Sequence, residues 1–287
     1  MNKGTYKNAI RHAELVSASP ENKEIAGQAR NDASVKNIVF RNSHKILLYI
    51  MTFFFFTGCD KEDACDIFKT RGEQIVEHRS LPNFNTIKIG NGINVFITNG
   101  DDNSVKIEGW KNLMPKIILS VNEEGVLEVD DKNTFNFVRN RDNRTTLHLS
   151  VSGEINCIDF SGDGVVVSND TIHTAGLTIL SLKASGSVDL KVNAQWISIG
   201  TSHENVASIT LSGFGESVGI THWGYNPVDL SGLGASHASI HHHGPANVYV
   251  NTSETLEVVV YGVGNVYYRG NPKITLTREG KGNLYKF

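Results

Sequence analysis

The chain has 287 residues, a formal net charge of −3 at pH 7 and 27 glycines. No basic block stands out, so nucleic acid is not expected to be a partner. Beyond the first sixty residues Val, Ile, Thr, Asn and Ser are plentiful while Ala, Leu and Met are scarce, a composition that favours strands and turns.

Residues 1–38 lie upstream of a segment that has the layout of a signal peptide, which is the wrong place for a folded domain. They resemble a translated repetitive-DNA segment. We therefore expect translation to start near Val39 and exclude this extension from the fold.

Residues 39–58 have a basic start, an apolar run over 46–56 and small residues before Cys59. This is the layout of a secretory signal, and the run is shorter than the roughly 20 apolar residues of a transmembrane helix. Ending in Thr-Gly-Cys, it resembles a bacterial lipoprotein signal, in which the cysteine is lipidated and becomes the mature N-terminus. The alternative is a buried apolar strand. We expect a lipid on Cys59 to anchor the protein to a membrane.

Residues 59–74 are expected to form a linker. Its Lys61-Glu62-Asp63 resembles the signal that sends some gram-negative lipoproteins to the outer face of the outer membrane, although an ordinary charged linker would look the same. The expected location is therefore the outer membrane, facing the cell surface, or otherwise the periplasm. Cys65 and Cys157 either pair in an oxidising compartment or stay free.

The segment from residue 75 to 150 contains short alternating runs. Tight turns are expected at Asn99–Gly100 and at Glu124–Gly125, the second of them in a hairpin. The positions expected to face inward are Ile87, Ile89, Ile93, Val95 and Ile97.

Beyond residue 150 a glycine-containing turn recurs after apolar runs. Its first glycines are Gly162, Gly186, Gly213, Gly232, Gly262 and Gly280, on average about 24 residues apart. Such spacing predicts an all-β solenoid, a right-handed parallel β-helix-like fold with irregular coils of about 20–30 residues.

The repeat "ITLSGFG…ITHWG" and "VDLSGLG…IHHHG" indicates two successive coils. Stacking them places Leu211 over Leu230, Ile209 near Val228, and His242 over His222. Whether residues 75–150 continue this β-helix or form a separate cap is left open by the sequence.

The stretch "LPNFNTIKIGNGINVFI" contains Gly92, Ile93 and Asn94. With the "SGxG" coils it resembles the head GIN domain of the putative auto-transporter adhesin family, over residues 75–287. The resemblance implies a β-helix-like fold on secreted or lipid-anchored proteins. It brings no established catalytic residues.

A histidine cluster is the first candidate site. His237, His241 and His243 share the parity of one strand face, so they are a candidate set of transition-metal ligands. Against this, three histidines close in sequence do not fix a tetrahedral geometry, and polar residues at a coil corner would give the same pattern.

Aromatic residues are the second candidate. Trp223, Tyr225, Tyr267 and Tyr268 would make a glycan-binding strip if their rings line one face, but rings that fill corners or cap the end are the alternative. The acids considered as a stacked catalytic set are Asp159, Asp163, Asp189 and Asp229.

The sequence thus predicts a cell-envelope lipoprotein that is not an enzyme and acts as a binding, adhesion or structural module. The expected partners are glycans or surface proteins, no cofactor is expected, and homo-oligomerisation is left open. The alternative is a polysaccharide lyase or hydrolase on the same scaffold.

Overall fold

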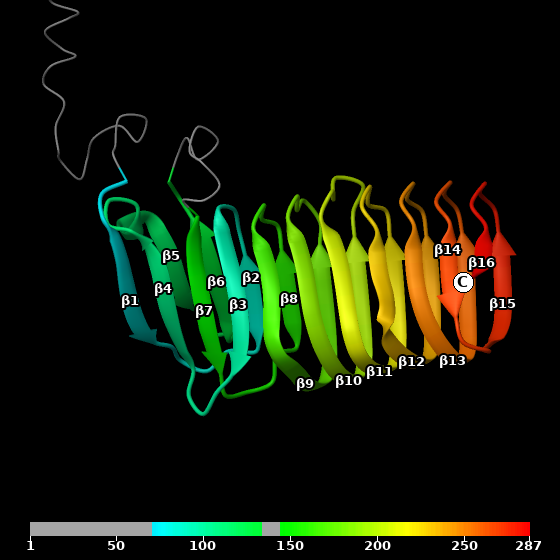
Figure 1. Ribbon diagram of the computed structural model, residues 1–287, viewed down its shortest axis with the longest axis horizontal. Helices are drawn as coiled ribbons and strands as arrows, with labels where there is room; N and C mark the ends of the chain where they lie inside the picture. The colour runs from blue at the N-terminus through cyan, green and yellow to red at the C-terminus, as the bar shows by residue number, and fades with distance from the viewer. Residues whose placement is uncertain (1–70, 134–143) are drawn as a thin grey trace, which may run out of the picture. The chain divides into compact units, whose positions relative to one another are not determined.

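The computed structural model describes residues 71–133 and 144–287, which form a two-sided β-solenoid (Figure 1). No α-helix occurs in these ranges, which hold one 3₁₀ turn, η1 (Met114–Lys116). The strands in chain order are β1 (Gln74–Ser80), β2 (Thr86–Ile89), β3 (Ile93–Asn99), β4 (Ser104–Trp110), β5 (Ile117–Val121), β6 (Val126–Asp131), β7 (Thr145–Val151), β8 (Cys157–Phe160), β9 (Val165–Ser181), β10 (Ser187–Thr201), β11 (Ser208–His222), β12 (Val228–His242), β13 (Val248–Val260), β14 (Val266–Arg269), β15 (Lys273–Arg278) and β16 (Leu284–Lys286).

The long strands β9 to β13 each contribute to two sheets. The first half of β9 pairs with β3 and its second half with β8, while the first half of β13 pairs with β14 and its second half with β15. Each strand therefore bends once and adds one rung to a first sheet and one to a second sheet, which Figure 1 shows as two layers of arrows. We call the turn from the second sheet to the first sheet of the next coil the return corner.

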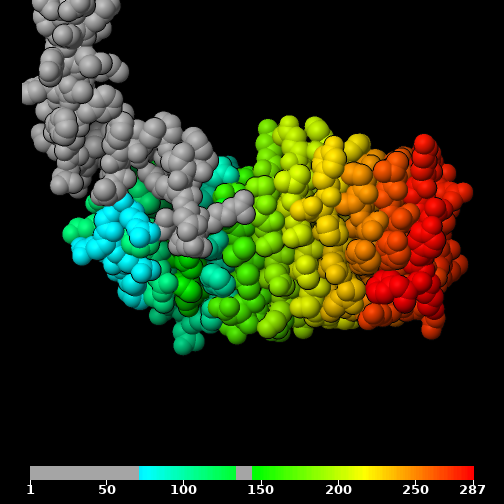
Figure 2. Space-filling view, turned by 45° about the horizontal axis from the view of Figure 1, so that its top comes forward, coloured from blue at the N-terminus to red at the C-terminus, as the bar shows by residue number. Residues whose placement is uncertain are grey.

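The coils stack in parallel register. Equivalent positions are separated by 22 residues between Val165 and Ser187 and by 18 between Val266 and Leu284. The predicted all-β solenoid is confirmed, and its coils in this part are more even than expected and lie at or just below the lower end of the expected 20–30 residues. Figure 2 shows them as successive bands of the surface from green to red.

The overestimate arose because the glycine repeat mixes two kinds of bend. Gly162, Gly186, Gly262 and Gly280 lie at return corners, whereas Gly213 and Gly232 lie inside β11 and β12, where those strands pass between the sheets. Gly213 has φ of 107°, a conformation that other residues rarely adopt. All six glycines serve bends, but the "SGxG" of β11 and β12 is not a return corner.

The part of residues 75–150 that the structure describes continues the solenoid. β3 pairs in parallel with both β7 and β9, and β2 with both β6 and β8, so these strands extend both sheets. The N-terminal end is made by antiparallel partners, because β1 pairs with β4, β4 with β7 and β5 with β6. The hairpin at Glu124–Gly125 is confirmed. The turn at Asn99–Gly100 makes no hairpin, since β7 lies between β3 and β4.

The core lies between the two sheets and is filled by the alternating apolar positions. The five residues expected to face inward are 0–1% exposed. The predicted stacking is confirmed for Ile209, which pairs with Val228, and for His222, which pairs with His242. The register shifts at Leu211, and both Leu211 and Leu230 are buried. Apolar ladders of this kind supply the burial that one coil lacks.

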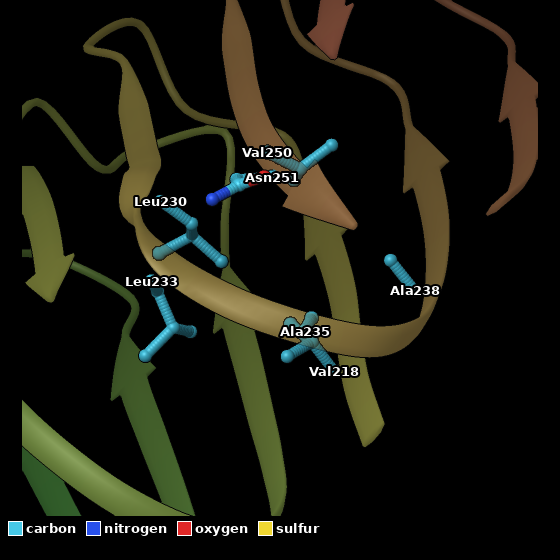
Figure 3. Close-up of a pocket in the computed structure, with 7 residues that line it drawn as sticks. All are labelled: Val218, Leu230, Leu233, Ala235, Ala238, Val250 and Asn251. Atoms are coloured by element: carbon cyan, nitrogen blue, oxygen red, sulfur yellow. The ribbon is translucent and has the colours of Figure 1, made fainter. Parts of the chain in front are cut away.

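The coil changes length between β12 and β13. Leu230 pairs with Val250 and Gly234 with Asn251, so β12 carries three extra residues at its bend. One of them, Leu233, turns inward and is 1% exposed. Figure 3 shows Leu230 and Leu233 around this bend, beside a narrow apolar gap that has no room for a water molecule.

The Gly92-Ile93-Asn94 motif joins two coils that are distant in sequence. Gly92, with φ of 76°, donates its N–H to Asp163 Oδ1 at 2.7 Å, and Asn94 Oδ1 accepts the N–H of Val165 at 3.2 Å. Ile93 is fully buried. The motif therefore has a structural role, holding β3 against the start of β9.

Candidate functional site

The most distinctive surface lies along the return corners of the C-terminal coils. Trp223 follows β11, His243 follows β12 and Tyr261 follows β13, so one ring projects from each successive corner. The ring centroids of Trp223 and His243 are 3.9 Å apart with 5° between planes, and those of His243 and Tyr261 are 4.4 Å apart with 8°. These three residues form a continuous stack of rings.

Apolar side chains extend this stack along the same edge. Other return-corner residues with large exposed side chains are Leu182, Val206, Tyr225 and Val263. Trp223 is 44% exposed, Tyr225 61% and Tyr261 41%. We call the seven residues, including His243, the corner strip. Contiguous exposed apolar surface of this kind marks interaction sites.

A layer of buried histidines lies beneath the corner strip. His222 and His242 end β11 and β12, and both are 0% exposed. The Thr201 hydroxyl oxygen accepts the backbone N–H groups of Trp223 at 3.0 Å and Gly224 at 3.2 Å and lies 2.9 Å from His222 Nδ1. The two N–H groups occupy both lone pairs of the hydroxyl oxygen, so the hydroxyl contacts Nδ1 as a donor. Nδ1 is then the acceptor, and the imidazole proton is assigned to Nε2. The network holds the corner that carries Trp223.

The three histidines at these corners, His222, His242 and His243, are uncharged at neutral pH because the pKa of each is lowered. Burial lowers the pKa of His222 to about 4, with a further contribution from His242. Burial likewise lowers the pKa of His242. Burial beside the two neighbouring rings, and then the charge of His241, lowers the pKa of His243. The stack of Trp223, His243 and Tyr261 therefore presents a neutral face with a neutral layer below it.

The predicted aromatic set is divided between three settings. Trp223 and Tyr225 belong to the corner strip. Tyr267 lies on the first sheet, its ring 5.0 Å from that of Tyr249 and 5.5 Å from that of Tyr285. Tyr268 is partly buried and packs against the core. The four residues do not form one strip. Trp223 and Tyr225 lie at a return corner, whereas Tyr267 and Tyr268 are neighbours in β14 and point to opposite sides of the sheet.

The sequence also contained a signal for the stacking of these three rings, which was missed. Trp223, His243 and Tyr261 each stand directly before a glycine, as "WG", "HG" and "YG", 20 and 18 residues apart. That spacing matches the coil length. Aligning these dipeptides would have predicted the stack.

The three histidines predicted as metal ligands are not brought together. His243 is stacked between two rings, and His237 Nδ1 lies 2.8 Å from Thr255 Oγ1 on the second sheet. Across residues 71–133 and 144–287, no group of three or more His, Cys, Asp or Glu side chains is arranged to hold a metal ion. The interpretation as a metal site is therefore not supported. β12 ends at His242, so His243 lies in the turn that follows and does not share the strand face of His237 and His241.

The acids considered for catalysis have structural partners or stand apart. Asp163 pairs with the Arg144 guanidinium at 2.5 Å and accepts the Gly92 N–H, while Asp229 Oδ1 accepts the Ser231 N–H at 2.9 Å. Asp159 and Asp189 lie on β8 and β10, in different sheets. These acids do not form a catalytic set within the described ranges, which leaves the alternative of a glycan-cleaving enzyme without support from their geometry.

Cys157 has a free thiol in the described region, and burial, followed by the charge of Asp159, raises its pKa. Cys65, Cys59 and the Lys61–Asp63 segment lie outside the described residues. In the part of the chain that the structure describes, no helix has the length and apolar character needed to cross a bilayer.

Comparison with known proteins found a family whose model covers most of the solenoid. The family model described as "Putative auto-transporter adhesin, head GIN domain" matches residues 83–272. The chain belongs to this family. The GIN motif has a defined place in this member, at the turn from β2 into β3, where it contacts the start of β9. No curated protein matches the chain.

Solved structures share the fold. A putative adhesin from Bacteroides fragilis NCTC 9343 superposes with a TM-score of 0.69 at 23% identity, covering 75% of this chain and 97% of that one. A putative adhesin from Parabacteroides merdae ATCC 43184 gives 0.58 at 17% identity, with the same coverage. A protein from Parabacteroides distasonis ATCC 8503, described as a putative lipid binding protein, gives 0.56 at 15% identity over 75% of this chain and 97% of that one. At these identities the likeness concerns the fold.

Proposed function

We propose that this GIN-domain protein is a non-catalytic adhesion module of the cell envelope that binds a surface protein through its corner strip. The observation that carries the proposal is the exposed stack of Trp223, His243 and Tyr261. Stacked rings already held in place lose little entropy on binding, and aromatic anchors dominate protein interfaces. The aliphatic side chains along the same edge suit a protein partner.

An array of purified envelope and extracellular-matrix proteins tests this function. The variant Trp223→Ala/Tyr261→Ala should bind its array partner at least about 10-fold more weakly than the unmodified protein, as expected for two anchor residues. Tyr267→Ala/Tyr285→Ala removes two rings from the first sheet and serves as the matched control. Equal losses in both variants, or binding to no protein, would overturn the proposal.

We further propose that a lipid on Cys59 anchors the module to the outer membrane, facing the cell surface. The signal-like layout of residues 39–58 and the Lys61-Glu62-Asp63 segment support this. Labelled palmitate should enter the protein and be absent from Cys59→Ser. Protease added to intact cells should remove the module, and replacing Lys61, Glu62 and Asp63 by alanine should protect it.

A further inference from the structure

A shallow groove of about 410 Å³ crosses the outer surface of the second sheet, away from the return corners. Two rows of outward-facing residues line it. One row runs Trp196, Ser217, His237, Thr255, and the other continues through Gly219, Ser239 and Glu257. Its volume falls within the range of small-ligand sites, about 300–1,000 Å³.

The groove exists because its floor carries small side chains. Ser217, Gly219 and Ser239 occupy adjacent rungs, so little projects from the sheet there. A Cβ placed on Gly219 would have its nearest heavy atom 4.0 Å away, which marks open space above it. Larger side chains, Trp196 on one side and His237 and Glu257 on the other, form the walls.

Trp196 is held as a platform. Its indole lies over Gly176 of the neighbouring coil, where a Cβ would come within 1.8 Å of the ring. The glycine therefore lets the indole lie down on the sheet, and the side chain still has 47% of its surface exposed. A fixed, exposed aromatic ring offers its face to a flat apolar surface of a ligand.

The opposite side of the groove is polar, and hydrogen-bond and ionic contacts hold its His237 side chain in place. His237 Nδ1 lies 2.8 Å from Thr255 Oγ1, and Nε2 lies 3.6 Å from Glu254 Oε2. These contacts hold the imidazole against Glu254 and Thr255 of β13, at the edge of the groove. Glu257 follows Ser239 on the next rung and has an exposed carboxylate. The wall thus supplies hydroxyl, imidazole and carboxylate groups, which together donate and accept hydrogen bonds.

An aromatic platform at one end of a row of small polar groups matches the chemistry of sugar rings, which have C–H bonds on one face and hydroxyls around the edge. We propose that this groove binds a neutral oligosaccharide, with one sugar ring stacked on Trp196 and hydroxyls of the sugar rings that follow it bonded by His237, Ser239 and Glu257. The two carboxylates at Glu254 and Glu257 disfavour an anionic sugar by like-charge repulsion. The site is separate from the corner strip.

An array of immobilised oligosaccharides tests the inference with the purified protein. Arms ending in glucose, galactose, mannose or N-acetylglucosamine are compared with matched arms ending in sialic or uronic acid. We expect binding to at least one neutral arm. Exclusive binding to acidic arms, or binding to no saccharide, would overturn the proposal.

Variants then locate the site. Trp196→Ala and Ser239→Tyr, which removes the platform or fills the floor, should each weaken saccharide binding at least about 10-fold, whereas Trp223→Ala should leave it unchanged. Trp196 and Ser239 lie outside the core, and circular dichroism and the melting temperature establish that each variant is folded. Unchanged binding by Trp196→Ala and Ser239→Tyr would overturn the assignment to this groove.

Fluorescence gives a second readout. The chain has three tryptophans, at 110, 196 and 223. The best neutral saccharide from the array should shift the emission of the unmodified protein and of Trp223→Phe, and Trp196→Phe should lose the shift. A shift that persists in Trp196→Phe would contradict stacking on Trp196. Because the corner-strip test uses Trp223 and Tyr261 with protein partners, either proposal can fail while the other stands.

Discussion

The imidazole rings of His222 and His242 stack on adjacent coils with their centroids 5.4 Å apart and 10° between their planes. Both side chains are fully buried, and both have a lowered pKa because burial disfavours the charged form. This pair makes the corner region sensitive to acid.

We expect the free energy of unfolding to decrease as the pH falls from about 6.5 towards about 4. The pKa of His222 is about 4 in the folded protein against 6.5 for an unperturbed histidine. Between these values the unfolded chain binds more protons, so acid favours unfolding. The pKa difference corresponds to roughly 3 kcal/mol from His222. Urea denaturation at a series of pH values measures the decrease.

The variant His222→Asn should reduce this pH dependence and leave the part that His242 contributes, because an amide oxygen can accept the Thr201 hydroxyl and does not titrate. His203→Gln, which replaces an exposed histidine, is the control and should keep the full decrease. An identical pH profile for His222→Asn and the unmodified protein would refute the assignment.

The fold and much of the stacking were predictable from the sequence, because alternating apolar residues and glycine bends report directly on strands and coils. The pairing of His222 with His242 followed from aligning two repeats. The corner strip was predicted only in part. Trp223 and Tyr225 were named as candidate binding residues, but Tyr261 was not, because its coil lacks the "SGxG" motif. The groove at Trp196 could not be predicted, because it depends on which residues meet across four coils. The sequence pattern of a single strand does not show which side chains of neighbouring coils lie next to each other.

Thr201 should be more important to stability than its small size suggests. Thr201→Val keeps the shape of the side chain but removes the acceptor for the Trp223 and Gly224 N–H groups and the partner of His222. Unsatisfied buried groups cost about 1–3 kcal/mol each, so we expect a loss of at least about 2 kcal/mol in chemical denaturation. Thr221→Val, at an exposed position of β11, should change stability by no more than about 0.5 kcal/mol. Equal effects of the two changes would argue against the network.

Gly164 should not tolerate a side chain, although its backbone φ is ordinary. A Cβ there would lie 1.8 Å from the carbonyl oxygen of Ile93, within the contact that the GIN motif makes with the start of β9. Gly164→Ala must therefore push two coils apart and should lower stability by about 3 kcal/mol or more, or prevent folding. Gly219→Ala, in open space on the second sheet, is the matched control. Its melting temperature should stay close to that of the unmodified protein, and a similar fall in both would contradict the close packing.

An asparagine ladder secures the last coils. Asn247 Oδ1 accepts the N–H of Asn265 at 3.1 Å, and Asn265 Oδ1 accepts the N–H of Asn283 at 2.9 Å. Asn265→Ala removes the second acceptor and should lower the free energy of unfolding by about 1–3 kcal/mol.

Because coils of a solenoid contact only their neighbours, this loss of stability should be local. Amide hydrogen exchange should therefore accelerate in β14 to β16 and stay unchanged in β2 and β3. Asn193→Ala, at an exposed position of β10, should leave both regions unchanged. Uniform acceleration along the chain would show instead that the solenoid opens as one cooperative unit.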